Sequence, residues 1–153
     1  MANIHLAARA KNWINAVGAG VWASGAGWLC IHYLLPRPNA FGLSPAEPWW
    51  LKAHGAFAFL ALWTGGLLWG VHVVKAWHER RHRWTGGALF GLLLVLIVTG
   101  YLLYYAGDDQ VRGIVSPTHW ILGLCLPMVY VVHRIVKKIR RRSARGHRVT
   151  PKN

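Results

Sequence analysis

Four long apolar segments dominate this chain, at about residues 14–35, 53–74, 84–106 and 117–139. Each has the roughly 20 residues that an α-helix needs to cross the hydrocarbon core of a bilayer. Because these segments take up most of the 153 residues, we expect residues 1–139 to form a single transmembrane domain. The predicted fold is an all-α, integral membrane, up-and-down four-helix bundle.

The connections between the segments differ from them in composition. The stretch 36–48 contains four prolines and the stretch 107–116 begins with Gly-Asp-Asp, so both are predicted to be loops. Residues 140–153 are predicted to be a basic tail.

The charged residues are sorted along the chain. Of 18 Lys and Arg residues, which give a net charge of +14 with only 4 acids, 15 precede the first span, separate the second from the third, or follow His133. The remaining loops carry Glu47, Asp108 and Asp109. Basic residues accumulate on the cytoplasmic side of a membrane, so we expect a multi-pass protein of the cell inner membrane with both termini in the cytoplasm.

The high net charge does not indicate nucleic-acid binding. The tail has neither aromatic residues nor an apolar period, whereas nucleic-acid binding requires a folded basic surface. The expected partner of the tail is the anionic surface of the lipid bilayer.

Four histidines lie inside the second and fourth spans, where ionisable side chains are costly and rare. His54 and His72 are 18 residues apart, which places them on one helix face about 27 Å apart. His119 and His133 are 14 residues apart and also share a face, about 21 Å apart. With antiparallel topology, His54 and His119 are on the outer side and His72 and His133 are on the inner side. The pattern predicts two cross-helix pairs at two depths.

Two facing imidazoles are the axial ligands that haem b requires. We therefore expect two haem b groups, with His54 and His119 on the outer iron and His72 and His133 on the inner iron. A zinc or non-haem iron site needs three or four ligands at one level, and each level offers two histidines and no buried carboxylate. The alternative for the histidines is polar contact between helices.

The glycines of the second to fourth spans have two interpretations, namely space for a flat macrocycle and close helix packing. They are Gly65, Gly66, Gly70, Gly86, Gly87, Gly91, Gly100 and Gly123.

The remaining histidines leave alternatives open. His32, near the outer end of the first span, is a candidate third ligand, a hydrogen-bonding residue, or a partner for a haem propionate or a quinone. His5 lies before the first span; whether it is a ligand stays open, and His72 is the predicted inner ligand. His78 and His82 lie in the basic loop between the second and third spans.

The sequence resembles the four-helix di-haem membrane cytochromes b, which include cytochrome b561-type proteins and the membrane anchors of respiratory enzymes. The resemblance covers roughly residues 50–139 and rests on HGAFAFLALWTGGLLWGVHVVKAW, RWTGGALFGLLLVLIVTGYLLYY and HWILGLCLPMVYVVH. It implies an electron-transfer subunit that passes electrons across the bilayer between a quinone pool and a partner redox protein on the outer side.

The basic residues near the span ends suggest further contacts. Arg81, Arg83, Arg134 and Lys137 are placed to neutralise inner-haem propionates, and Lys52 or Arg112 to do so outside. As a hypothesis, a quinone site lies at one bundle end, with His32 outside or His78 and His82 inside as proton acceptors.

Two other functions compete with electron transfer to a partner. One is a self-contained quinone-linked oxidoreductase of the superoxide-oxidising type, which would need a charged funnel above the outer haem. The other is a haem-free membrane scaffold in which the histidines only connect helices.

Overall fold

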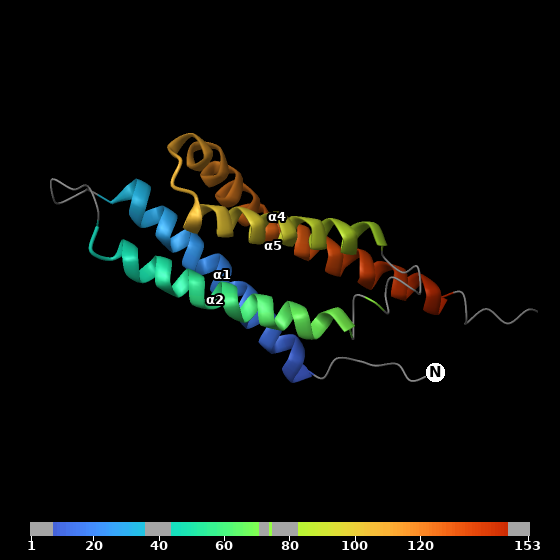
Figure 1. The fold of residues 1–153 in the computed structure, drawn as a ribbon. Coiled ribbons are helices and arrows are strands. Elements are labelled where there is room, and N and C mark those ends of the chain that lie inside the picture. Colours follow the sequence, from blue (N-terminus) through green and yellow to red (C-terminus); the bar gives the residue numbers. More distant parts are fainter. Residues whose placement is uncertain (1–7, 36–43, 71–73, 75–82, 147–153) are drawn as a thin grey trace, which may run out of the picture. The chain divides into compact units, whose positions relative to one another are not determined.

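The structure is a computed structural model, and it describes residues 8–35, 44–70, 74 and 83–146; of residues 8, 83 and 140–146 only the backbone is described. Four helices make up the described chain: α1 (Ala8–Leu34), α2 (Glu47–Leu68), α4 (Arg83–Tyr105) and α5 (Asp109–Gly146) (Figure 1). None of the described residues is in a β-strand. The all-α prediction is therefore confirmed.

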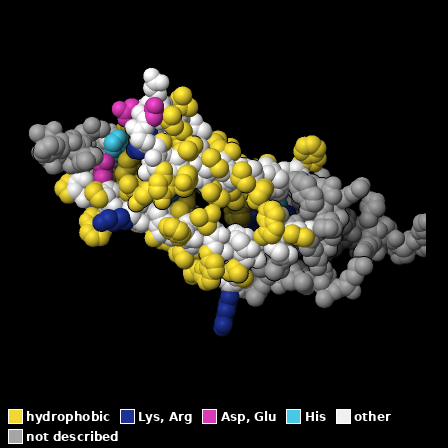
Figure 2. Space-filling view, viewed as in Figure 1, with side chains coloured by type: hydrophobic (Ala, Val, Ile, Leu, Met, Phe, Trp, Pro, Cys, Tyr) yellow, Lys and Arg dark blue, Asp and Glu magenta, His cyan; other side chains and the backbone are white. Residues whose placement is uncertain are grey.

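Each of the four helices contains a stretch long and apolar enough to cross a membrane. These stretches are Arg9–Leu34, Glu47–Leu68, Trp84–Tyr105 and Asp109–Ile139. Their side chains face outward on most sides: Phe59 is 76% and Trp84 92% exposed, and hydrophobic side chains cover much of the visible surface (Figure 2). In the described chain Val17 is the only hydrophobic residue counted as buried. Helices that are apolar all round are typical of membrane spans, so the fold indicates a multi-pass membrane protein.

The chain forms two compact units, residues 1–75 and 76–153, and each is a pair of packed helices. The first unit is the α1–α2 hairpin. Its helices are antiparallel, since Trp13 contacts Thr64 near one end of the pair and His32 contacts Glu47 near the other. Close approach is possible because α1 presents glycines to aromatic rings of α2, Gly20 to Phe57 and Gly27 to Trp50.

Helix α2 begins at Glu47, six residues before the predicted start of the second span at residue 53. Pro48 lies in the first turn of α2, where a missing N–H costs nothing because it would have no intrahelical partner. The first carboxylate of the helix is Glu47, which suits the positive end of the helix dipole. The last two residues of the predicted 36–48 loop are therefore helical.

The second unit is the α4–α5 hairpin, in which residues 106–108 form the connection. The predicted loop at 107–116 is wrong, because α5 begins at Asp109. The Asp108 Oδ1 atom accepts the backbone N–H groups of Gln110 at 2.7 Å and Val111 at 3.1 Å. This is an N-cap, which gives partners to backbone donors that a helix leaves unpaired.

Helix α5 also extends beyond the predicted fourth span at its other end. It runs for 38 residues to Gly146, with Pro117 and Pro127 inside it, as membrane helices tolerate. The first part of the predicted basic tail is thus a continuation of this helix.

Candidate functional site

His54 lies in the second turn of α2, and its ring packs against α1. Its Nδ1 atom is 3.0 Å from the carbonyl oxygen of Val21 and 3.2 Å from the Ser24 hydroxyl. Since a carbonyl can only accept a hydrogen bond, the Nδ1 atom carries the proton and donates it. In a neutral imidazole with this tautomer, the lone pair is on Nε2.

The Ser24 hydroxyl has a fixed direction because it also bonds to its own helix. It is 2.7 Å from the carbonyl oxygen of Gly20, four residues earlier, and donates its proton there. The oxygen of Ser24 is then left to accept a hydrogen bond from the neighbouring helix. The side chain is 3% exposed, so this arrangement is shielded from the surroundings.

His119 repeats this arrangement in the second hairpin. Its Nδ1 atom is 2.9 Å from the hydroxyl of Thr99 on α4, and that hydroxyl donates its proton to the carbonyl oxygen of Val95 at 2.7 Å. The Thr99 oxygen therefore accepts the Nδ1 proton of His119. The lone pair of the neutral ring is again on Nε2.

His133, further along α5, has the same kind of partner. Its Nδ1 atom is 3.1 Å from the hydroxyl of Thr85 on α4. Thr85 and Thr99 are 14 residues apart, as are His119 and His133. Because α4 and α5 are antiparallel and the two intervals are equal, Thr85 lies opposite His133 and Thr99 lies opposite His119.

A glycine follows each hydroxyl residue, and each glycine faces the same imidazole. A Cβ atom on Gly25 would lie 3.0 Å from Cε1 of His54, on Gly100 3.3 Å from Cε1 of His119, and on Gly86 3.8 Å from Cε1 of His133. The local motif is thus Ser-Gly or Thr-Gly on one helix and His on the next. Of these glycines, Gly25 was not predicted; the signal was the dipeptide itself, which occurs at 24–25, 85–86 and 99–100, and also at 64–65, where no described imidazole faces the glycine.

The other predicted glycines divide into two groups. A Cβ atom added to Gly123 would lie 3.8 Å from a methyl carbon of Leu96, an ordinary van der Waals contact. At five others, no described atom would come within 4 Å of an added Cβ, so none is needed for packing inside its own hairpin. These five are Gly65, Gly66, Gly70, Gly87 and Gly91.

Several predicted site residues lie outside the described residues. They are His72, Arg81, His5, His78 and His82. Of Arg83 only the backbone is described. The pairings of His54 with His119 and of His72 with His133 each join two units that are described separately, so both stay predictions.

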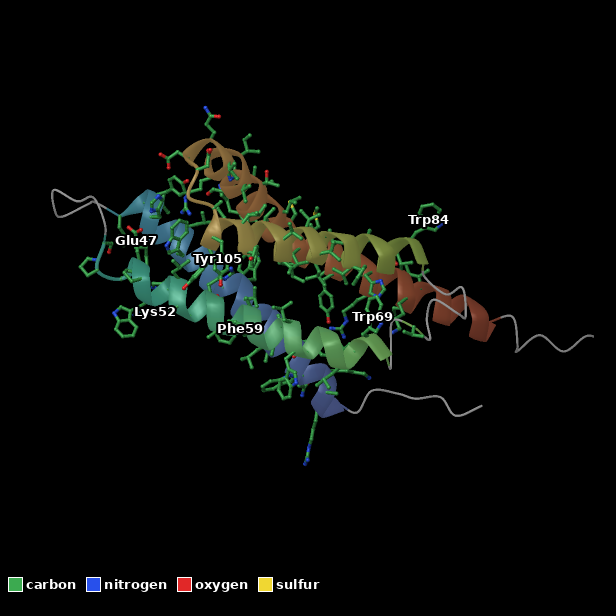
Figure 3. The ribbon with its side chains drawn as sticks, in the orientation of Figure 1. Glu47, Lys52, Phe59, Trp69, Trp84 and Tyr105 are labelled. Carbon is green, nitrogen blue, oxygen red and sulfur yellow. The ribbon has the colours of Figure 1, made fainter. Side chains whose placement is uncertain are left out.

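His32, near the end of α1, hydrogen bonds to the carboxylate of the first residue of α2. Its Nδ1 atom is 3.0 Å from Oε2 of Glu47, and the Trp28 ring stacks on the imidazole with centroids 4.7 Å apart. Glu47 is 5% exposed and lies where the hairpin turns (Figure 3). The expectation of no buried carboxylate at the outer level is therefore wrong. The sequence placed Glu47 in a loop, and its position in the first turn of α2 explains its burial.

The predicted propionate partners make other contacts. On α5, Arg134 lies over the ring of Tyr130, one turn earlier on the same helix. The guanidinium of Arg112 donates to the Leu103 carbonyl oxygen at 2.7 Å, at the last turn of α4, where it satisfies a backbone acceptor. The Lys52 ammonium lies 4.7 Å from the ring centre of Trp49.

Within the described ranges, no three His, Cys, Asp or Glu side chains come together as they would around a bare metal ion. Each of three imidazoles, by contrast, has Nδ1 held by a partner on the adjacent helix. No protein-family model, curated protein or solved structure matches this chain significantly.

Proposed function

We propose that this chain is a di-haem b cytochrome of the inner membrane, carrying electrons across the bilayer between a quinone pool and a partner redox protein on the outer side. The axial ligands are His54 with His119 and His72 with His133. Both termini are cytoplasmic. The proposal places the chain with the four-helix membrane cytochromes b that its sequence resembles.

The repeated contact of imidazole Nδ1 with a hydroxyl or carbonyl group carries this proposal. A histidine that ligates a metal through Nε2 nearly always donates its other N–H to such an acceptor, which fixes the tautomer and the ring orientation. His54 and His119 meet this requirement through Val21 and Thr99. A neutral Nε2 donor from each side of the porphyrin is what a bis-histidine haem requires.

The glycines support the same assignment. Gly25 and Gly100 let an imidazole lie directly on the backbone of the adjacent helix. The glycines that no described side chain of their own hairpin covers, such as Gly66 on α2 and Gly91 on α4, leave room for a planar group. Packing of the two helices within each hairpin does not use these uncovered glycines.

When bound, each haem takes up or gives up one electron at its iron. The protein contributes the ligands, their orientation, an apolar surrounding and positive charge for the propionates. Arg81, Arg83 and Arg134 remain the candidates for inner propionates. The self-contained superoxide-oxidising alternative has less support, because Lys52 lies on Trp49 and Arg112 binds the end of α4.

Haem quantitation on the purified protein tests the proposal. We expect two b haems per chain, with low-spin bands in the reduced-minus-oxidised spectrum. His54→Ala and His119→Ala should each remove one haem. The double variant should remove no more than either single variant, because both residues serve the same iron. His147→Ala, in the basic tail, is the matched control and should keep both haems.

The outcomes separate the candidate functions. If the purified wild-type protein contained no haem, only the third candidate function, a haem-free membrane scaffold, would remain. Loss of both haems in the double variant, with one lost in each single variant, would contradict the pairing. Haem reduction by superoxide, with release of O₂ and onward reduction of a quinone, in the absence of any partner protein would favour the self-contained oxidoreductase.

A further inference from the structure

We propose that His32 and Glu47 form the proton-accepting group of a quinol-binding site at the loop end of the α1–α2 hairpin. This proposal rests on the proposed electron-transfer function and assigns one part of it, the place where a quinol binds and gives up its protons. The substrate class is a membrane quinol, and the residue that takes the proton is His32.

Glu47 is held in a single orientation. Its Oε1 atom accepts the backbone N–H of Ser44 at 3.1 Å, and its Oε2 atom faces His32 Nδ1 at 3.0 Å. The residue is 5% exposed, and buried carboxylates in proteins are rare unless they are paired. Both oxygens of this carboxylate are engaged, so it orients and stabilises the imidazole and does not itself bind a ligand.

The His32 ring is fixed by three contacts. The Nδ1 atom faces the Glu47 carboxylate. The imidazole stacks on the Trp28 ring with ring centroids 4.7 Å apart, and it meets the Tyr33 ring in a T-shaped contact with centroids 4.8 Å apart. The side chain is still 24% exposed, and among the described residues nothing hydrogen bonds to Nε2. In the neutral ring with Nδ1 donating to the carboxylate, Nε2 is the proton-accepting atom.

An imidazole oriented by a carboxylate is a proton acceptor of known chemistry. The carboxylate holds the ring in the correct tautomer and stabilises the imidazolium that forms when Nε2 takes a proton. Such a pair removes the proton of a substrate hydroxyl group that lies within hydrogen-bond distance of Nε2. A quinol offers this hydroxyl on a flat aromatic ring, and Trp28 and Tyr33 supply aromatic surfaces beside the imidazole.

The position of His32 agrees with this role. His32 is eight residues after Ser24 on α1, or about 12 Å along the helix axis, and Ser24 contacts His54. Both His32 and Ser24 contact α2, so they are on the same side of α1. A quinol at His32 is therefore about two turns of α1 away from the contact that holds the proposed outer ligand His54.

The proton and electron balance is as follows. A quinol becomes a quinone by losing two electrons and two protons, and the two haems, when bound, would supply the acceptor for one electron each. The first O–H proton moves to Nε2 of His32, which becomes an imidazolium paired with Glu47. That proton is released to water on the outer side, and the second follows by the same route.

The test compares His32→Gln and Glu47→Gln with the matched control Asp109→Asn, an exposed carboxylate in the first turn of α5. Haem-loaded protein in lipid nanodiscs is mixed with decylubiquinol, and the rate of haem reduction is followed by stopped-flow absorbance. We expect His32→Gln to slow it roughly 100-fold, as for loss of a general base. Asp109→Asn should keep the wild-type rate.

A binding measurement gives a readout that does not depend on turnover. Decylubiquinol is titrated into the same nanodiscs after dithionite has reduced the haems, so that no electron transfer follows, and its heat of binding is recorded. Glu47→Gln should weaken its binding about tenfold, because the imidazole loses the partner that orients it. The His32→Gln amide can still donate to Glu47, so the hairpin stays connected and its melting temperature should stay near that of the wild type.

Dithionite separates the two proposals. If the purified wild type contains no haem, the proposed function and this site fail together. If dithionite reduces the haems of wild type and His32→Gln alike while decylubiquinol also reduces both at one rate, only the His32–Glu47 proposal is overturned. If dithionite reduces the haems of the wild type but decylubiquinol does not, the quinol site is overturned as well.

Discussion

Ser24 and Thr99 each place a hydroxyl oxygen within 3.2 Å of an imidazole Nδ1 atom. Hydroxyl side chains inside helices commonly donate to the carbonyl one turn earlier, as both do here. Because the hydroxyl proton is donated to a carbonyl oxygen of the same helix, the hydroxyl oxygen can only accept a hydrogen bond from the histidine. A single small side chain thereby decides which nitrogen of the histidine carries the proton.

The glycine beside each hydroxyl gives a sharp prediction. Gly25→Ala should displace the His54 ring, because the new Cβ atom would lie 3.0 Å from its Cε1 atom. We expect loss of the outer haem, measured as haem per chain. The matched control is Gly55→Ala, next to His54, where no described atom lies within 4 Å of the added Cβ.

The expected loss cannot come from a weakened helix. Alanine stabilises a helix by about 1 kcal/mol relative to glycine, so both variants should have firmer helices. Gly100→Ala, with a contact of 3.3 Å, should have a smaller effect than Gly25→Ala. Equal haem content in Gly25→Ala and Gly55→Ala would refute the assigned contact.

Only some of these residues could be predicted from the sequence. Histidines inside apolar segments are conspicuous, because ionisable groups are rare at membrane depth. Ser24 and Gly25 are ordinary residues of a membrane helix, and their role depends on the helix register that brings them to His54. Glu47 could not be placed either, because its burial depends on where α2 begins.

At the level of the helices, the apolar length determines the spans but capping determines where helices begin. The predicted spans overlap α1, α2, α4 and α5, because each span needs about 20 apolar residues to cross the bilayer. The start of α5 differs because Asp108 caps it. The polar stretch after Gly107 has low hydropathy and gives no apolar signal, so only the Asp108 cap indicates a helix there.

The cap can be tested separately from the site. Asp108→Ala should destabilise the first turn of α5 by about 1 kcal/mol. Amide hydrogen exchange at Gln110 and Val111 should then become roughly fivefold faster. Exchange in the middle of α4 should not change.

Asp109→Ala is the control for this prediction, since it removes a neighbouring charge and keeps the cap. If Asp108→Ala leaves the exchange of Gln110 and Val111 at the wild-type rate, the hydrogen bonds at 2.7 and 3.1 Å do not hold the helix end.

At the level of the whole molecule, the sorting of basic residues predicts the orientation of the protein. A cysteine replacing Gln110, in the first turn of α5, should react with a membrane-impermeant maleimide added to intact cells. A cysteine replacing Ser143, in the last part of α5, should react only after the membrane is opened. The free thiols of Cys30 and Cys125 are first replaced by serine.

The reverse labelling pattern would invert the proposed orientation and move the His32–Glu47 pair to the cytoplasmic side. Labelling of both positions in intact cells would show a leaky preparation, which a cytoplasmic marker protein detects. The charge distribution could be analysed fully from the sequence because it does not depend on packing.

The equal intervals in the second hairpin have a consequence for how such a sequence can change. Thr85 to Thr99 and His119 to His133 both span 14 residues. One inserted residue in either interval would turn everything beyond it by about 100° and move it about 1.5 Å along the axis, so one of the two pairs would separate. Substitutions between the paired residues are therefore tolerated far more easily than insertions or deletions, and a change of length in one helix survives only with a matching change in the other.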